Sequence, residues 1–522
     1  MRSLSPSEKS WGTLPSEIRL LIIQSLVQDG STLACLAAVS RAWQTDIEQY
    51  NFTRIKLNPS RLMDFRSIIC RNQALTRYIW FCLELDGYDC TQCAPKTGEL
   101  TYEEREAALT VSDTEHCPIT TAFEGFFSIL SDWDQDSELM LDISIYSPSD
   151  AQHWFPYLTF VPDNPSDRLE GSGLELTTIT QGYHDPFHGW VTGFRHSAPP
   201  REAIYKVFHS IMEEGPFDSD QSEFRWWDQL PSVSAVTSIL LRQQNRRRWR
   251  PCTLAHMLAR FPRLQEVYYE PWREWSSLKR LTDRQYLYLF KSIRHGHYPL
   301  KKLVVFENFN QQYPVFMQRF LDGEDLAQCD SIRNPAPAVA RTIALTSLPL
   351  EHLAASFIIE ASHFFAIEPS WEWPNLTSLV LTSRLLTPGE DSTKIDALLQ
   401  AAAAAALRMP RLETMEIWNG QKGLAALFQY RVIRGSQQTR ILWRGTWKYH
   451  ITPSVLQAWE AVGHLHDSWR LDVVQEQVEE AAIQPHGDAL HHLMLSGQVI
   501  RSVSLQQIRR EQKSLEGVTI VS

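Results

Sequence analysis

Cysteine and histidine side chains that could bind a metal gather in one part of the sequence. Cys90 and Cys93 form a Cys-x-x-Cys pair, and His116 and Cys117 follow it. Thiolates and imidazoles together can complete a tetrahedral zinc site. Two adjacent residues cannot easily both turn toward one metal, however, and the sequence holds no second Cys-x-x-Cys pair. We therefore favour ordinary loop cysteines over a zinc site and expect no metal and no other cofactor.

A run of arginines, Arg246-Arg247-Arg248-Trp249-Arg250, could bind an anion or act as a nuclear import signal. Four guanidinium groups beside an aromatic ring suit anionic ligands. The chain nevertheless carries 61 acidic against 50 basic residues, a net charge of −11, so acidic neighbours are plentiful. The sequence therefore favours a solvated, ion-paired helix end at this run, and we expect no nucleic-acid partner.

Motifs that place a nucleophile, a metal or a phosphate for catalysis are missing from the sequence. It contains no Gly-x-Ser-x-Gly, no His-Glu-x-x-His and no glycine-rich phosphate loop. His486, His491 and His492 lie near an expected strand, but no pair of carboxylates stands out as a general acid and base. We therefore expect no enzyme. A hydrolase site assembled from scattered residues is the least favoured alternative.

Composition indicates a globular chain with a large core. Of the 522 residues, 43% are hydrophobic, and they include 23 Phe, 18 Trp and 16 Tyr. No apolar run approaches the roughly 18 residues that a membrane-spanning helix needs. Residues 1–13 also lack the apolar stretch of a secretory signal. We expect a flexible N-terminus over residues 1–10, no membrane partner, reduced thiols and a location in the cytoplasm and/or the nucleus.

Residues 11–50 have the spacing of three short helices. Pro15 suits the first turn of a helix, because its missing N–H would be unpaired there. Apolar residues then recur every three or four positions along one face, at Ile18, Leu21, Ile22 and Leu26. Forty residues hold too little core to be stable alone, so periodicity leaves a helical cap on the next domain equally open.

The same residues closely resemble an F-box. The sequence Leu-Pro-x-Glu-Ile, the apolar ladder and the ending Val-Ser-Arg-x-Trp occur together and in the F-box order over residues 11–50. In that family the module is a three-helix hook that binds the adaptor Skp1 and so joins a cullin-RING ubiquitin ligase. The insertion of Asp29-Gly30-Ser31 between the first two helices departs from the commonest pattern. The resemblance implies a Skp1-binding surface formed by Leu14, Pro15, Ile18, Ile22, Leu33, Leu36, Val39 and Trp43.

A second pattern, Leu-x-x-Leu-x-Leu, recurs in residues 226–522. Strong copies begin at Leu264, Leu300, Leu376 and Leu412, with intervals of 300 − 264 = 36, 376 − 300 = 76 and 412 − 376 = 36 residues. We place a degenerate copy at 339–345, inside the double interval, and weaker copies at 236–241 and 490–495. Residues with the spacing of amphipathic helices precede the strong copies, at 254–261, 286–293, 350–357 and 395–402.

A helix and a short strand, repeated in this way, form the unit of a leucine-rich-repeat-like solenoid, although 36 residues exceed the usual 20 to 29. The alternative is a conventional α/β domain whose strands share the pattern by coincidence. Residues 51–225 are less legible. They contain strand-like stretches at 75–80, 139–145 and 174–179 that could be degenerate early repeats.

From Arg246 onward the chain also resembles the C-terminal domain of a group of fungal F-box proteins. The resemblance rests on Tyr-Glu-Pro-Trp-Arg-Glu-Trp at 269–275, on Phe-Glu-Asn-Phe-Asn-Gln-Gln-Tyr-Pro at 306–314 and on Glu-Ile-Trp-Asn-Gly at 416–420. That domain has no assigned chemistry, so the resemblance bears on architecture and not on a substrate.

We therefore expect an α/β protein in which a three-helix F-box is followed by an irregular leucine-rich-repeat-like solenoid. The resemblance implies the substrate-receptor subunit of an SCF-type ubiquitin ligase, which binds Skp1, through it a cullin, and an unidentified target protein. The alternative is a scaffold that binds Skp1 without a role in degradation.

The expected solenoid also suggests where a target would bind. Side chains alternate along a strand, so the residues between and after the core positions of each repeat face the other side of the sheet. We expect this face to be exposed and to bind the target through Tyr268, Glu270, Val304, Phe306, Val380, Thr382, Glu416 and Trp418. The alternative is that a later helix or the C-terminal tail covers these residues.

Overall fold

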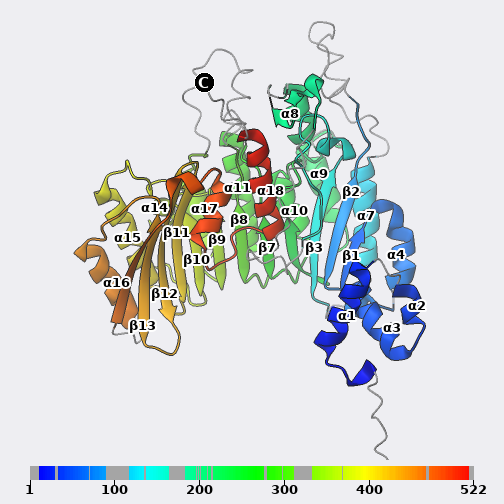
Figure 1. Cartoon of the computed structure of the whole chain (residues 1–522), viewed down its shortest axis with the longest axis horizontal. Helices are drawn as coiled ribbons and strands as arrows, with labels where there is room; N and C mark the ends of the chain where they lie inside the picture. Colours follow the sequence, from blue (N-terminus) through cyan, green and yellow to red (C-terminus); the bar gives the residue numbers. More distant parts are fainter. Residues whose placement is uncertain are drawn as a thin grey trace, which may run out of the picture.

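A computed structural model of the chain contains a 12-stranded sheet with helices on both faces (Figure 1). The expected α/β class is confirmed. The structure describes residues 11–516 apart from 30–32, 70, 90–116, 134–136, 164–182, 196, 198, 200, 209, 213–215, 275–278, 297, 311–331, 367, 369 and 466–469. The N-terminus expected to be flexible, residues 1–10, and the strand expected at 174–179 lie outside the described residues.

Short helices form the beginning of the described chain. They are η1 (Trp11–Thr13), α1 (Ser16–Gln28), α2 (Leu33–Ala37) and α3 (Arg41–Thr53). Helix α3 begins where the hydroxyl of Ser40 accepts a hydrogen bond from the backbone N–H of Trp43, which satisfies one free donor of the first turn. It ends at Thr53, and strand β1 (Arg54–Leu57) begins at the next residue. The helical unit is therefore joined to the sheet without a linker.

The strands of the large sheet pair in chain order. Strands β1 to β11 of this sheet are all parallel. After β1 come β2 (Tyr78–Glu84), β3 (Leu139–Tyr146), β6 (Val236–Leu241), β7 (Glu266–Tyr269), β8 (Lys302–Phe306), β9 (His352–Ser356), β10 (Ser378–Thr382) and β11 (Thr414–Gln421). Antiparallel β12 (Leu424–Ile433) and β13 (Gln438–Gly445) follow, and β14 (Arg470–Gln477) pairs parallel to β13 at the edge. Residues 51–225 thus contribute β1, β2 and β3 to the same sheet.

One face of the sheet packs against a layer of helices. The alternating residues Leu303 and Val305 of β8 belong to this layer, as their spacing of two predicts. None of the described helices combines the length and the apolar composition that crossing a bilayer requires. The helices that share this core are α4 (Leu62–Ile69), α7 (Pro118–Ser131), α9 (Asp220–Gln229), α10 (Pro251–Leu258), α11 (Lys279–His295), α13 (Pro337–Thr346), α14 (Ala361–Phe364), α15 (Ser392–Ala406) and α16 (Pro453–Leu465).

The C-terminal segment covers the opposite face. Helices α17 (His486–Leu493) and α18 (Ser502–Glu516) lie across the middle strands in Figure 1. Their apolar residues form a second core with the alternate set of strand residues, which includes Val304 and Phe306 of β8. The remaining short elements are η2 (Pro59–Arg61), η3 (Gln73–Leu75), η4 (Pro148–Ala151), η5 (Pro186–His188), β4 (Trp190–Val191), β5 (Phe194–Arg195), α8 (Arg201–Phe208) and η8 (Glu480–Ala482).

Three expectations about the repeats are wrong. The strand expected at 339–345 lies in α13, the helix expected at 350–357 contains β9, and the strand expected at 490–495 lies mostly in α17. Pro337 explains why residues 339–345 form a helix and not a strand. It lies in the first turn of α13, a position that proline favours. The spacing is also less regular than a 36-residue period: strand starts are 352 − 302 = 50 residues apart from β8 to β9 and 378 − 352 = 26 from β9 to β10.

Buried polar contacts fix α18 to the sheet. The guanidinium of Arg246 pairs with the carboxylate of Glu511, and both side chains are at most 2% exposed. Arg501, just before α18, pairs with Asp163. The amide of Gln243 donates to the backbone oxygen of Ser504 at 3.0 Å. A buried charge is tolerated only when it is paired and hydrogen-bonded, so these contacts specify where the C-terminal segment lies.

The Glu511→Ala variant should be strongly destabilised, because it leaves the guanidinium of Arg246 buried beside no carboxylate. Breaking a buried pair in this way costs about 3–5 kcal/mol. Chemical denaturation followed by tryptophan fluorescence measures the change in the free energy of unfolding. Arg434→Ala is the matched control, since its pair with Glu413 is largely exposed and should contribute about 0–1 kcal/mol. Equal losses of unfolding free energy in the two variants would contradict the view that the buried ion pair holds α18 on the sheet.

Candidate functional site

The residues implied as Skp1-binding all retain accessible surface. Pro15, Ile18 and Val39 are exposed, the latter two by 42% and 66%. The other five, Leu14, Ile22, Leu33, Leu36 and Trp43, are partly exposed. Further apolar side chains of α1 are exposed beside them, at Leu20, Leu21 and Val27. A small helical unit therefore carries several exposed apolar side chains.

Two contacts hold these helices in place without burying that apolar surface. The rings of Trp11 and Trp43 stack with their centroids 3.7 Å apart. The carboxylate of Asp46 on α3 accepts hydrogen bonds from Trp11 Nε1 and from Arg19 Nη1, each at 2.7 Å. Among the described residues of this unit only Ile23 and Ile47 are buried, so its own core is very small.

The residues expected to bind a target are buried, so the expected exposure is wrong. Tyr268 is 4% exposed, and Phe306 and Trp418 are both 0% exposed. They face away from the helix layer, as alternation predicts, but α17 and α18 pack on them. The other members of the set are also buried, at Glu270, Val304, Val380, Thr382 and Glu416. No target can reach this face while the C-terminal segment covers it, and we do not propose it as a binding surface.

The two acidic members of that set have structural partners in the C-terminal segment. Glu416 accepts hydrogen bonds from the backbone N–H of Ser496 at 2.8 Å and from the amide of Gln429 at 2.6 Å. Glu270 accepts from the backbone N–H of Arg501 at 2.9 Å, and burial raises the pKa of its carboxyl group. Both carboxylates therefore position the chain between α17 and α18 instead of meeting solvent.

The arginine run is ion-paired, as favoured from the sequence, but it is not a solvated helix end. Arg246, Arg247, Arg248 and Arg250 pair with Glu511, Asp150, Glu274 and Glu223 respectively. The run lies between β6 and α10, and Arg246 and Arg247 are buried. A cavity of about 40 Å³ beside the run has room for a few water molecules. These arginines are therefore not available as an import signal.

An open groove lies on the same face of the sheet as α17, beyond the part that the C-terminal helices cover. Its volume is about 740 Å³, and strands β11 to β14 form its floor. Met494, which follows α17, borders it and is 62% exposed. The lining includes four arginines and two glutamates, which are Arg431, Arg434, Arg440, Arg444, Glu413 and Glu476.

Arg431 is the distinctive residue of this groove. It lies directly opposite Arg440 in the antiparallel pair of β12 and β13, and like charges in this position are destabilising. Arg440 pairs with Asp472 at 3.0 Å, whereas the exposed Arg431 has no ion pair among the described residues. The groove therefore presents one uncompensated guanidinium in a position that costs stability.

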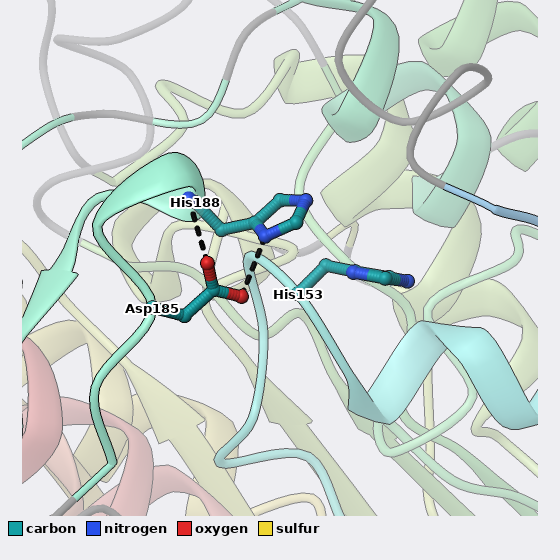
Figure 2. Close-up of side chains that lie close together, drawn as sticks. All are labelled: His153, Asp185 and His188. Atoms are coloured by element: carbon teal, nitrogen blue, oxygen red, sulfur yellow. Dashed lines mark hydrogen bonds and ion pairs between the residues drawn. The ribbon is translucent and has the colours of Figure 1, made fainter.

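A group of two histidines and one aspartate lies in the crossover between β3 and β6 (Figure 2). His153, Asp185 and His188 each offer one potential metal-ligand atom, and these atoms lie within 4.8 Å of one another. Burial, and then the neighbouring His188, lower the pKa of His153. This group could not be predicted from the sequence, because 185 − 153 = 32 residues separate its two parts and no motif links them.

The cysteines considered for zinc do not form a described site. Cys90, Cys93 and His116 lie outside the described residues. Cys117 is a buried free thiol directly before α7.

The three C-terminal histidines lie on α17, a helix in the place where the sequence predicted a strand. His486 is fully buried, and its Nε2 lies 2.9 Å from Asn308 Oδ1, while its ring stacks on Phe309 at 4.2 Å. Its Nδ1 is buried without a hydrogen-bond partner. Burial lowers the pKa of His486 to about 3. The side chain is therefore a neutral part of the core under α17.

Acidification should destabilise the protein through His486. The unfolded chain binds a proton at this residue below about pH 6.5, whereas the folded chain does so only near pH 3. The free energy of unfolding therefore falls by about 1.4 kcal/mol per pH unit over most of this window. Denaturation of wild type and of His486→Gln, which retains an amide donor for Asn308, at pH 7 and 5.5 measures this. The wild type should lose about 1 kcal/mol more, and equal losses would contradict the assignment.

One family model matches part of the chain. It is described as a family of unknown function (DUF6546) and matches residues 297–501, which is 501 − 297 + 1 = 205 of the 522 residues. No curated protein matches the chain. The matched stretch contains β8 to β14 and α17, and it ends at Arg501, directly before α18. The chain is thus similar to this family over the part of the sheet that carries the open groove, and the match assigns no activity to it.

Proposed function

We propose that the chain is the substrate-receptor subunit of an SCF-type ubiquitin ligase. In this proposal residues 11–50 bind Skp1, and through it a cullin, while the sheet holds a target protein. The receptor itself makes and breaks no bonds. It raises the rate of ubiquitin transfer by keeping a target lysine near the charged conjugating enzyme, so that a bimolecular encounter becomes effectively intramolecular.

The exposed apolar side chains of the N-terminal helices carry this proposal. Ile18, Leu21 and Val39 are exposed by 42%, 56% and 66% on a unit with almost no core of its own. Such surface is typical of a protein interface, because it is unfavourable in water until a partner covers it. These side chains lie in the stretch whose residue order resembles an F-box. The sheet, with strands paired in chain order, supports a leucine-rich-repeat-like interpretation of the remainder.

The double variant Ile18→Ala/Val39→Ala should lose Skp1. Both side chains are exposed, so truncation removes contact area for the partner without opening a cavity in this chain. Interface anchors commonly contribute about 2 kcal/mol each, which predicts a loss of affinity of roughly 100-fold or more for the pair. Titration of purified Skp1 against the full chain measures the dissociation constant.

Met63→Ala provides the matched control, since Met63 is 81% exposed but lies on α4, outside the Skp1-binding stretch. Wild-type affinity in the Ile18→Ala/Val39→Ala variant would reject the assignment of the Skp1-binding surface.

Affinity purification followed by mass spectrometry then distinguishes a substrate receptor from a scaffold that binds Skp1 without a role in degradation. Skp1 together with a cullin supports the receptor, whereas Skp1 alone supports a scaffold.

We assign target binding to the open groove of β11 to β14. The proposed occupant is an acidic segment of the target protein, because Arg431 offers an uncompensated positive charge and lies opposite Arg440. A bound carboxylate would relieve that repulsion and would pair with Arg431. The groove is open to solvent, unlike the buried part of the same face under α17 and α18.

Charge reversal at Arg431 should abolish binding in the groove. An oligo-glutamate peptide is the probe, and fluorescence anisotropy with the full chain measures its affinity. We expect weak, salt-sensitive binding by wild type and at least a tenfold loss in Arg431→Glu, with Skp1 affinity unchanged. Arg284→Glu is the control, because Arg284 is exposed on α11, in the helix layer. Equal loss in both variants would indicate non-specific attraction and contradict the assignment.

A further inference from the structure

We propose that His153, Asp185 and His188 bind a zinc ion or a chemically similar divalent transition metal. The three residues come from the two turns η4 and η5 and their flanks, in the crossover between β3 and β6. This crossover has its own apolar cluster, which contains Trp154, Trp190 and Phe208. The site would therefore fasten two loops of a small subdomain at the side of the sheet.

The local backbone brings Asp185 and His188 together. Asp185 caps η5, where its Oδ1 accepts the backbone N–H of His188 at 3.3 Å. Its Oδ2 lies 2.6 Å from Nδ1 of the same histidine. Gly189 ends the turn with φ of +75°, and a Cβ there would lie 2.2 Å from the hydroxyl of Ser197. The left-handed backbone thus favours a glycine at the point that fixes the direction of His188.

His153 reaches the same place from the other loop. Its ring centroid lies 4.5 Å from that of His188, and Figure 2 shows the two imidazoles projecting to the same side of Asp185. The residue adopts φ of +54°, a left-handed conformation that costs a non-glycine residue stability. Trp154 packs edge-on against His188 at 5.5 Å, and only 3% of the His188 side chain is exposed. The two imidazoles are therefore held together in a partly dry environment.

The donor set indicates the class of metal. Two imidazoles and one carboxylate suit zinc and its neighbours, whereas calcium and magnesium prefer oxygen ligands alone. In a tetrahedral site with bonds of about 2.0–2.1 Å, ligand atoms lie about 3.3 Å apart. The ligand atoms here lie within 4.8 Å of one another, and rotation of the partly exposed His153 and Asp185 side chains about the buried His188 can bring them to the required spacing. Three protein ligands leave one position for water.

Metal binding to the full chain tests this proposal. The protein is treated with a chelator, dialysed, and titrated with Zn²⁺ by calorimetry, and thermal unfolding is followed with and without the ion. We expect one equivalent to bind to wild type and to raise the unfolding temperature. The His153→Ala and Asp185→Asn variants should lose that equivalent and the thermal shift. His153 is partly exposed, so its variant should still fold.

His256→Ala is the matched control, because His256 also pairs with an aspartate, Asp228, at 3.0 Å but belongs to no group of three potential metal ligands among the described residues. This variant should keep the zinc equivalent. Co²⁺ then reports the ligand type by its visible spectrum. An intense thiolate-to-cobalt charge-transfer band would show cysteine ligands and overturn the proposed set. Absence of binding in wild type, or full binding in His153→Ala, would also overturn it.

Discussion

The structure depends on covering both faces of a long, mostly parallel sheet. Every residue of β6 is buried, and four of the five residues of β9 are buried as well, so neither face of the middle strands can meet water. Parallel strands of this kind must be packed on both sides. Helices cover one side, while the C-terminal segment covers the other side at the middle strands and Phe160 packs on that side at β2 and β3. The placement of the C-terminal segment therefore determines which parts of the sheet remain open to partners.

Buried ion pairs decide where that segment lies. Arg242 and Asp142 are almost fully buried and join β3 to the end of β6, and Arg246 and Arg501 extend the same network to α18 and to Asp163. Apolar contacts alone would tolerate a shift of α18 along the sheet, because they are not directional. A shift would separate several buried charges from their partners, at a cost of several kcal/mol for each pair. The network therefore selects one position for the segment.

The sequence predicted which side of the sheet a strand residue faces, but it did not predict which of these residues another segment covers. Alternation correctly separated Val304 and Phe306 from Leu303 and Val305, because a strand has a fixed period of two. It could not show that residues 483–511 would cover the first pair, since this contact joins segments more than 170 residues apart in the chain, as His486 and Asn308 do. Apolar spacing also misassigned residues 350–357, because a strand buried on both faces has no alternation to distinguish it from a helix. The group of two histidines and one aspartate could not be predicted either, because its two parts are also far apart in the sequence.

The sheet separates the N-terminal helices from the groove, and this distance matters for the proposed receptor. Helix α3 runs directly into β1, and the groove lies around β12 and β13 at the other end of the sheet (Figure 1). Strand β13 is the eleventh in the sheet order, so ten inter-strand steps of about 4.8 Å place the groove about 48 Å from the N-terminal helices along the sheet. A continuous hydrogen-bonded sheet bends little compared with a linker of the same length. A target bound in the groove would therefore be held at a nearly fixed distance from Skp1, which narrows the set of lysines that can reach the ubiquitin donor.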